Sequence, residues 1–428
     1  MLDVGNVCKG VASTRPNLRS VIAAGFLCAA SFSTSIYALE SAEVTVTQAL
    51  ERAFQQNPEL AAASWNIDIA AGAREQAGLI PNPEVSFEVE DTRSNSRSTT
   101  VQLTQPIELG GKRGARVELA ERGQDAAAIK LQRSRNELRA TVIQAFYSVL
   151  RAKEQVALAK ESLALTERAL VVANGRVKAG KVSPVEAVRA QVQLSEVRLD
   201  VRRAAMAQTN AQQQLAAVMG DASIGLNQVK GNAHDLPSLP AAKQLLTQVN
   251  QTVDLRLAEM AINQQEASLR LEQSQRIPDL NVTVGTQYDA LENERVNVFG
   301  LSMPIPIFNR NQGNILSAAR RADQARDLRN ATELRIRTQT QLALEQWATA
   351  QEQLTSLHKT ILPAAKSAVT SATRGFEMGK FSYIDVLDAQ RTLLSARDQY
   401  IRSIAEATDA WVQIERIYGD ISVLTSSR

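Results

Sequence analysis

The sequence contains only two cysteines, Cys8 and Cys28, and both lie near its beginning. The stretch around them has the features of an export signal, in which basic residues precede the short apolar run 21–30 and small residues lead to Ala38. We therefore predict that residues 1–38 are a signal peptide. The exported chain would then have no disulfide, no thiolate nucleophile and no cysteine metal ligand. Bulky residues before Cys28 argue against its lipidation.

Long apolar runs, aromatic side chains and an excess of charge of one sign are also missing. After residue 38 no apolar stretch reaches the ~20 residues that a spanning helix needs, so any membrane insertion must use strands. Aromatic residues make up only 4% of the chain, a composition typical of long packed helices. The 48 basic side chains nearly balance the 45 acidic ones, so we expect no nucleic-acid partner.

Motifs for catalysis, cofactor binding or metal binding are absent from the sequence as well. Gly110-Gly111-Lys112 lacks the spacing of a nucleotide-binding loop and suits a turn from strand to helix. The two histidines, His234 and His358, are far apart in the sequence and form no recognisable ligand motif. We therefore predict that the protein is not an enzyme, needs no cofactor and has no metal site of its own.

The sequence does contain an internal repeat. The segment 180–191 returns as 379–390, at a distance of 199 positions, and Gly220 returns as Gly419 at the same distance. Between the two copies, a stretch rich in glycine, asparagine, proline and serine breaks the helical pattern. The predicted organisation is a first repeat over residues 39–220, a linker over 221–240, a second repeat over 241–420 and a tail over 421–428.

Each repeat is predicted to contain a helix, two strands, a very long helix and a further helix. The strands alternate apolar with polar residues, and the helices place apolar residues three and four positions apart. In the first repeat the predicted elements are a helix over 45–79 with a break at Asn57-Pro58, strands over 84–90 and 100–105, and helices over 111–174 and 184–219. In the second they are strands over 280–288 and 296–303 and a helix over 313–374 with a kink at Pro363.

The longest helices cannot fold back into a globule. At 1.5 Å per residue, a helix of ~60 residues reaches ~90 Å, so it must form an extended rod. Its apolar positions form a coiled-coil seam rich in alanine, which indicates closely packed helices. We predict the same seam in the helix over 184–219 and, 199 positions later, over 386–417. In the helix over 313–374, we predict that the seam runs through Ala343, Trp347, Ala350, Leu354, Leu357, Ile361, Ala364 and Ala368.

The strands require an oligomer. Four amphipathic strands cannot cover their apolar faces or pair their edges within one chain. Membrane barrels begin at about eight strands, and three chains with twelve strands give the smallest natural closure that is wide enough for a pore. The expected fold is mainly α with a β-barrel part: a trimeric twelve-stranded outer-membrane barrel, continued by a long α-helical coiled-coil tunnel.

Three segments of the chain resemble the TolC family of outer-membrane factors: the helix break at 57–60, the strand exit at 105–113 and the repeated motif at 379–389. The resemblance implies a homotrimer surrounded by outer-membrane lipid. It also implies a periplasmic tunnel that docks onto a periplasmic adaptor, the membrane fusion protein, and an inner-membrane RND pump. The stretch 108–113, Glu-Leu-Gly-Gly-Lys-Arg, is most similar to the CzcC branch, which implies a passive duct for cobalt, zinc and cadmium.

The resemblance also implies candidate site residues. In TolC-like proteins, aspartates that match Asp385 and Asp388 surround the periplasmic entrance, where crowded acids repel one another and can hold or select cations. Asp385 also has a structural explanation, because Ser382 and Asp385 fit a helix capping box. The turns expected to contact the adaptor contain Gly175, Gly180, Lys181, Gly379 and Lys380. Glycines there equally fit ordinary helix ends.

Two other functions remain open at this point. A TolC-like duct for drugs or secreted proteins would have the same fold. A periplasmic coiled-coil scaffold without a lumen is the second alternative, but it has no need of strand pairs with one lipid-compatible face.

Overall fold

The computed structural model describes residues 44–91, 93, 95–220 and 229–422. The predicted signal peptide, part of the predicted linker and most of the predicted tail lie outside these residues. The described elements are the helices α1 (Val46–Gln56), α2 (Pro58–Gly78), α3 (Lys112–Lys178), α4 (Pro184–Val218), α5 (Ala242–Thr247), α6 (Val253–Ser274), α7 (Gln312–Ser356), α8 (Leu362–Glu377) and α9 (Tyr383–Tyr418), the strands β1 (Glu84–Glu90), β2 (Ser98–Ile107), β3 (Leu280–Asp289) and β4 (Glu294–Ser302), the 3-10 turn η1 (Val249–Gln251) and the π-helical segment η2 (Leu357–Ile361).

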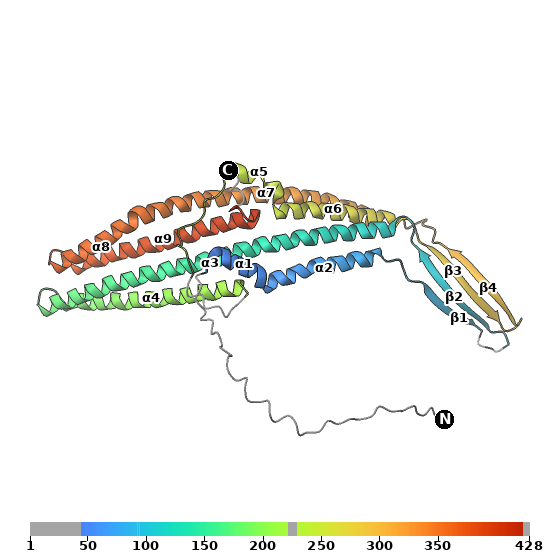
Figure 1. Cartoon of the computed structure of the whole chain (residues 1–428), viewed down its shortest axis with the longest axis horizontal. Helices are drawn as coiled ribbons and strands as arrows, with labels where there is room; N and C mark the ends of the chain where they lie inside the picture. The colour runs from blue at the N-terminus through green and yellow to red at the C-terminus, as the bar shows by residue number, and fades with distance from the viewer. Residues whose placement is uncertain (1–43, 92, 94, 221–228, 423–428) are drawn as a thin grey trace, which may run out of the picture. The chain divides into compact units, whose positions relative to one another are not determined.

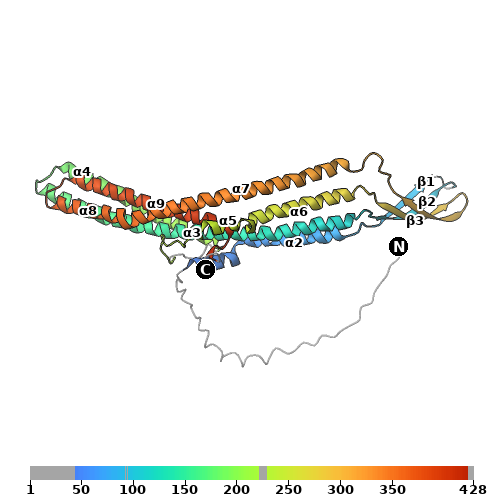
Figure 2. The same cartoon turned by 90° about the horizontal axis from the view of Figure 1, so that it is seen from above.

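The long helices have the sheet at one end and two connections between helices at the other. α2, α3, α6 and α7 lead to the four strands, whereas the connections from α3 to α4 and from α8 to α9 lie at the opposite end of the helices (Figures 1 and 2). α3 contacts α4, α6 and α9, so it joins the first repeat to the second along much of its length. Within the described ranges, no helix has both the length and the apolar character that a membrane crossing needs.

The predicted break between the first two helices is confirmed. Asn57 adopts an extended backbone, its side chain accepts a hydrogen bond from the Leu60 amide at 3.0 Å, and Pro58 occupies the first position of α2. The side-chain nitrogen Nδ2 of Asn57 also donates to the Val218 carbonyl at 2.9 Å. One side chain thus caps α2 and ties it to the end of α4.

The four strands form one antiparallel sheet in the order β1-β2-β3-β4, and they confirm the predicted strands. Val85 lies opposite Leu103, Leu103 opposite Val284, and Val284 opposite Phe299. These four side chains therefore share one face of the sheet, since residues directly opposite each other point the same way. All four are exposed, so the chain presents an uncovered apolar face.

The opposite face of the sheet is mainly polar: β1 places Glu84, Glu88 and Glu90 on it, although β4 adds Val296 and Val298. Gly285 lies on the same face, opposite Gln102. A Cβ atom at this glycine would lie 2.5 Å from the carbonyl oxygen of Val101, which is closer than any side chain tolerates. The close approach of β2 and β3 at this point therefore requires glycine.

The predicted seams of α3, α4 and α9 are largely confirmed. Ala152 on α3, Ala190 on α4 and Ala396 on α9 are all buried. Thr166 interrupts the apolar pattern of α3, yet it is buried too, because its hydroxyl donates to the Ser162 carbonyl at 2.9 Å. A polar residue can occupy the seam when its hydrogen-bonding group is satisfied within the helix.

The kink predicted at Pro363 takes the form of a π-helical turn. Proline has no backbone N–H and cannot donate to the residue four positions before it. The preceding segment Leu357–Ile361 widens into a π-helix, and the Leu362 amide donates to the Leu357 carbonyl. α7 and α8 are therefore continuous, with one wide turn between them.

This π-turn shifts the buried face of the helix, and the predicted seam is wrong beyond it. Ala343 is buried as predicted, but Ala364 and Ala368 are exposed. The neighbouring positions Ala365 and Val369 are buried instead. A π-turn contains about one residue more than an α-turn, so every later position rotates by one residue. Ile361, a predicted seam position at the end of the π-helical segment, is also exposed.

Two ion pairs, each with one buried partner, join α9 to α3. Arg397 is buried and donates to the Leu158 carbonyl at 2.9 Å and to Glu161 at 2.8 Å, and its burial lowers the pKa of the guanidinium. Nearer the end of α9, the buried Glu415 accepts a hydrogen bond from Arg139 at 2.7 Å. Burial raises the pKa of Glu415. Such pairs fix the register of the two helices, because removing one partner leaves a buried charge alone.

The shifted seam gives the first prediction. Ala365→Leu should strain the packed helices and lower stability by about 1–3 kcal/mol. Ala368→Leu, three positions later on the exposed face, should change stability by less than about 0.5 kcal/mol. Thermal melting of the purified oligomer measures both. A larger loss for Ala368→Leu would mean that the π-turn does not set the phase of α8.

Candidate functional site

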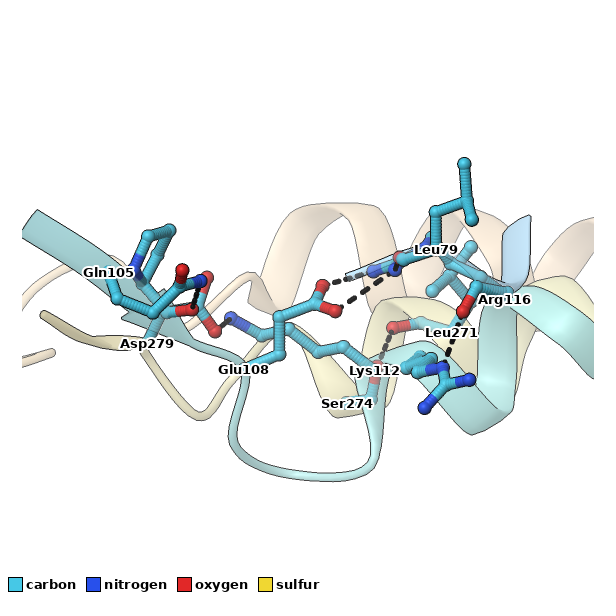
Figure 3. A network of polar contacts seen from close by, with 11 residues as sticks. Leu79, Gln105, Glu108, Lys112, Arg116, Leu271, Ser274 and Asp279 are labelled. Carbon is cyan, nitrogen blue, oxygen red and sulfur yellow. Dashed lines mark hydrogen bonds and ion pairs between the residues drawn. The ribbon is translucent and has the colours of Figure 1, made fainter. Parts of the chain in front are cut away.

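The connection from β2 to α3 is a compact polar junction built by the segment 108–113. Gly110 and Gly111 have φ angles of +71° and +74°, which turn the chain sharply from strand to helix. Glu108 then faces Arg116 one turn into α3 and forms a two-point ion pair with it (Figure 3). The hydrogen bond to Glu108 raises the pKa of Arg116. Arg116 also donates to the Leu79 carbonyl at 3.2 Å.

The same junction connects the two repeats. The Lys112 ammonium lies 2.7 Å from the Asp279 carboxylate, which precedes β3 (Figure 3). Gly110 packs so closely that a Cβ atom there would lie 2.8 Å from Cβ of Ile277 and 2.9 Å from the Ser274 carbonyl. The motif that resembles the CzcC branch thus has a structural role, because it ties the turn between β2 and α3 to the segment that precedes β3.

The predicted gate residues lie at the other end of the helices, in the first turns of α9. Asp385 accepts hydrogen bonds from the backbone amide and the hydroxyl of Ser382, both at 2.8 Å, so the capping box is formed. These hydrogen bonds, first that of the hydroxyl, lower the pKa of Asp385. Asp388 is exposed one turn later. Asp385 therefore has a structural role within its own helix.

A groove between α4 and α9 brings the two aspartates together with basic side chains. Arg189, which occupies the position of Asp388 in the first repeat, lines this groove with Arg391. Its remaining lining is partly apolar and includes Val185, Val188 and Ile384. Sequence reasoning placed the acids at the entrance but missed that arginines from both repeats share their groove.

The two turns at this end are shorter than predicted. α3 continues to Lys178, so Gly175 lies within the last helical turns and outside the loop. Gly180 and Gly379 do form the turns, with φ angles of +64° and +77°. Such left-handed residues end helices, and glycine adopts this conformation without strain. Lys181, which follows Gly180, is exposed.

The second turn contains a contact that the sequence did not suggest. Lys380 is exposed, whereas Gly375 is buried in α8 beneath the Phe381 ring. Arg176, from the first repeat, donates to the Phe376 carbonyl at 2.7 Å and stacks 4.4 Å from the centre of the Phe376 ring. This residue joins the ends of α3 and α8. The second repeat has Gly375 at the position of Arg176. This difference between the repeats was the one sequence signal that could have singled out Arg176.

The two histidines, far apart in the sequence, are neighbours in the structure. The His234 and His358 rings stack with centroids 5.0 Å apart, and the Tyr400 hydroxyl lies 3.3 Å from Nδ1 of His234. Their proximity was missed because His234 lies in a loop whose path no periodicity predicts. Among the described residues, no group of three or more histidine, cysteine, aspartate or glutamate side chains is arranged to hold a metal ion.

Comparison with known proteins identifies the family. The family model described as outer membrane efflux protein matches residues 49–221 and again residues 248–420. The chain belongs to the outer membrane efflux protein family. The efflux protein is 39% identical to the cobalt-zinc-cadmium resistance protein CzcC of Cupriavidus metallidurans over 376 residues, which cover 88% of this chain and 90% of that protein.

Solved structures show the same fold. The outer-membrane channel OprN matches with a TM-score of 0.73 at 18% identity, over 87% of this chain and 89% of that chain. CusC matches with a TM-score of 0.71 at 19% identity, over 88% and 91% of the respective chains. The fold is thus that of trimeric channels with a barrel and a helical tunnel. Family and neighbours are channel proteins rather than enzymes, and the efflux protein belongs in the outer membrane with a large periplasmic part.

The junction gives the second prediction. Gly111→Ala should cost about 1–2 kcal/mol, because its left-handed backbone disfavours a Cβ atom that otherwise has open space around it. Gly110 has a similar φ angle, but a Cβ atom there would also collide with Ile277. Gly110→Ala should therefore lower the melting temperature of the efflux protein more than Gly111→Ala does. Equal melting temperatures for the two variants would show that the close packing at Gly110 is unimportant.

Proposed function

We propose that this protein is the outer-membrane duct of a tripartite efflux system that exports divalent heavy-metal cations. Three copies would close one barrel, and the helices would continue it as a tunnel. The duct is passive, so a periplasmic adaptor and an inner-membrane RND pump would choose the cargo and supply the energy.

The observation that carries this proposal is the two-faced sheet. Its apolar face, with Val85, Leu103, Val284 and Phe299, is exposed, and its outer strands have unpaired edges within one chain. In lipid, each unpaired backbone group costs several kcal/mol, so the edges must pair with other copies. A closed ring would turn the apolar face to the lipid and the polar face to a lumen.

The similarity to CzcC supports heavy-metal cations as the cargo. It extends over nearly the full length of both chains. The polar face of the sheet agrees with this cargo, since Glu84, Glu88 and Glu90 would line the lumen in three copies. Carboxylates that surround a pore attract cations and repel anions.

The opposite end of the helices would be the entrance that meets the adaptor. The exposed turns there contain Gly180, Lys181, Gly379 and Lys380. Asp388 would face the axis together with its two copies, whereas Asp385 is held by its capping box. The loss of charge at these two positions should therefore have different effects.

Metal tolerance tests the proposed cargo. A strain that lacks this protein should become sensitive to cobalt, zinc and cadmium, and the full-length chain should restore growth. Sensitivity to a hydrophobic drug, measured in the same cultures, serves as the control. Unchanged metal tolerance with lost drug tolerance would favour the alternative duct for drugs.

Channel recordings test the gate. Asp388→Ala should weaken block by divalent cations and change conductance in planar bilayers, because the acidic ring loses three charges. Asp385→Ala should also remove a helix cap and lower the melting temperature. Wild-type conductance and wild-type divalent block in Asp388→Ala channels would remove Asp388 from the gate.

A further inference from the structure

The connection from β4 to α7 is a second junction, which repeats the first with different chemistry. α3 begins after Gly111 and α7 begins after Asn311, and both residues are left-handed, with φ angles of +74° and +60°. Counted from these residues, the position of Glu108 in the first junction is taken by Phe308 in the second. The position of its ion-pair partner is taken by a leucine. The second junction therefore lacks the ion pair that closes the first.

An apolar groove lies around Phe308. The Phe308 side chain is 90% exposed, and Leu316, one turn into α7, is 58% exposed. The groove has a volume of about 650 Å³, and Ile307 and the half-buried Ile315 complete its apolar lining. Exposed apolar surface of this kind marks a place where another molecule binds.

Hydrogen bonds hold the turn from which Phe308 projects. The Oε1 atom of Gln312 accepts from the Arg310 backbone amide at 2.8 Å, and its Nε2 atom donates to the Phe308 carbonyl at 3.2 Å. The Arg310 side chain also donates through Nε to the Pro306 carbonyl at 3.3 Å. The position of the exposed ring is thus fixed by its own turn.

Two arginines, Arg276 and Arg310, flank the groove, and both are exposed. Of the described residues that line the groove, none is acidic. Within the described ranges neither arginine forms an ion pair, whereas Arg116 of the first junction is paired with Glu108. The groove therefore combines an apolar lining with two cationic groups, which is the complement of an amphiphile with an anionic head.

The apolar surface of the sheet continues along the chain to this groove. β4 ends at Ser302, but Met303, Ile305 and Ile307 follow at alternate positions, and all three are exposed. In the first repeat, Gln105 occupies the position of Met303. The groove lies where the strands meet α6 and α7 (Figure 1). In the proposed barrel this is the level of the headgroups of the leaflet that faces the periplasm.

We propose that the groove binds an anionic phospholipid of this leaflet, with the phosphate at Arg276 and Arg310 and the acyl chains against Phe308 and Leu316. The proposal rests on the barrel proposed above, which places the apolar face of the sheet in lipid. Arginine suits the ligand, because its planar guanidinium donates two parallel hydrogen bonds to phosphate oxygens. A bound lipid would cover the apolar surface that one chain leaves open.

Native mass spectrometry of the full-length, delipidated oligomer tests the binding, with phosphatidylglycerol as the probe. The unmodified protein should bind phosphatidylglycerol more tightly than zwitterionic phosphatidylcholine. Arg276→Gln combined with Arg310→Gln should weaken the binding of phosphatidylglycerol by at least about tenfold, which corresponds to about 1.4 kcal/mol. The preference for the anionic lipid should disappear with it.

Arg202→Gln combined with Arg203→Gln is the matched control for this measurement. It removes the same charge from two exposed side chains on α4, away from the sheet, and should leave lipid binding unchanged. Equal affinity for phosphatidylglycerol in the groove variant and in the unmodified protein would overturn the proposal.

Fluorescence tests whether acyl chains occupy the groove. Phe308→Trp in bilayers of brominated phosphatidylglycerol should be quenched relative to the unmodified protein, whose three tryptophans give the baseline. Leu199→Trp, at an exposed position on α4, should not be quenched. A groove that a second copy covers, or that holds only a free anion, would leave Phe308→Trp unquenched, and either result would overturn the proposal.

Channel recordings on the same protein separate this site from the proposed duct. Conducting channels with neither selective lipid binding nor quenching would contradict the lipid site and leave the duct intact. Selective binding and quenching without conductance would contradict the duct alone.

Discussion

Unpaired strand edges are the constraint on which the rest of this structure depends. One chain supplies four strands, and backbone groups at the edges of β1 and β4 have no partner within the described residues. A barrel satisfies all of them, but only if several chains contribute. In such an assembly the apolar face of the sheet would meet lipid, and the acidic residues on its other face would line the lumen.

The helices must stay closely packed against one another over a long distance. Buried alanines such as Ala152, Ala190 and Ala396 allow close helix packing, and the ion pairs of Arg397 and Glu415 fix one helix against the next. Apolar seams alone permit sliding by whole turns. The buried charges remove that freedom, because a shift would separate them at a cost of several kcal/mol.

Most of the fold could be predicted from the sequence because periodicity reports on burial directly. The strands, the break at Asn57 and the seam of α9 follow from local patterns. The seam of α8 could not be predicted, since a π-turn changes the phase of the helix and leaves no mark in composition. At the entrance, Asp385 and Asp388 could be singled out from the family motif. Arg176 and the arginines of the groove come from other helices, and only the folded structure places them.

Gly285 shows how a single residue bears on the number of copies in a ring. The contact of β2 with β3 joins two repeats, and in the proposed barrel β4 of one copy would meet β1 of the next. Three copies would supply six hairpins, and each hairpin with its contact to the next must turn the wall by a sixth of a revolution. A Cβ atom at Gly285 would push β2 away from β3, so this one position bears on how far each contact turns the wall. The width of a closed ring would then depend on how closely two strands of a single chain approach each other.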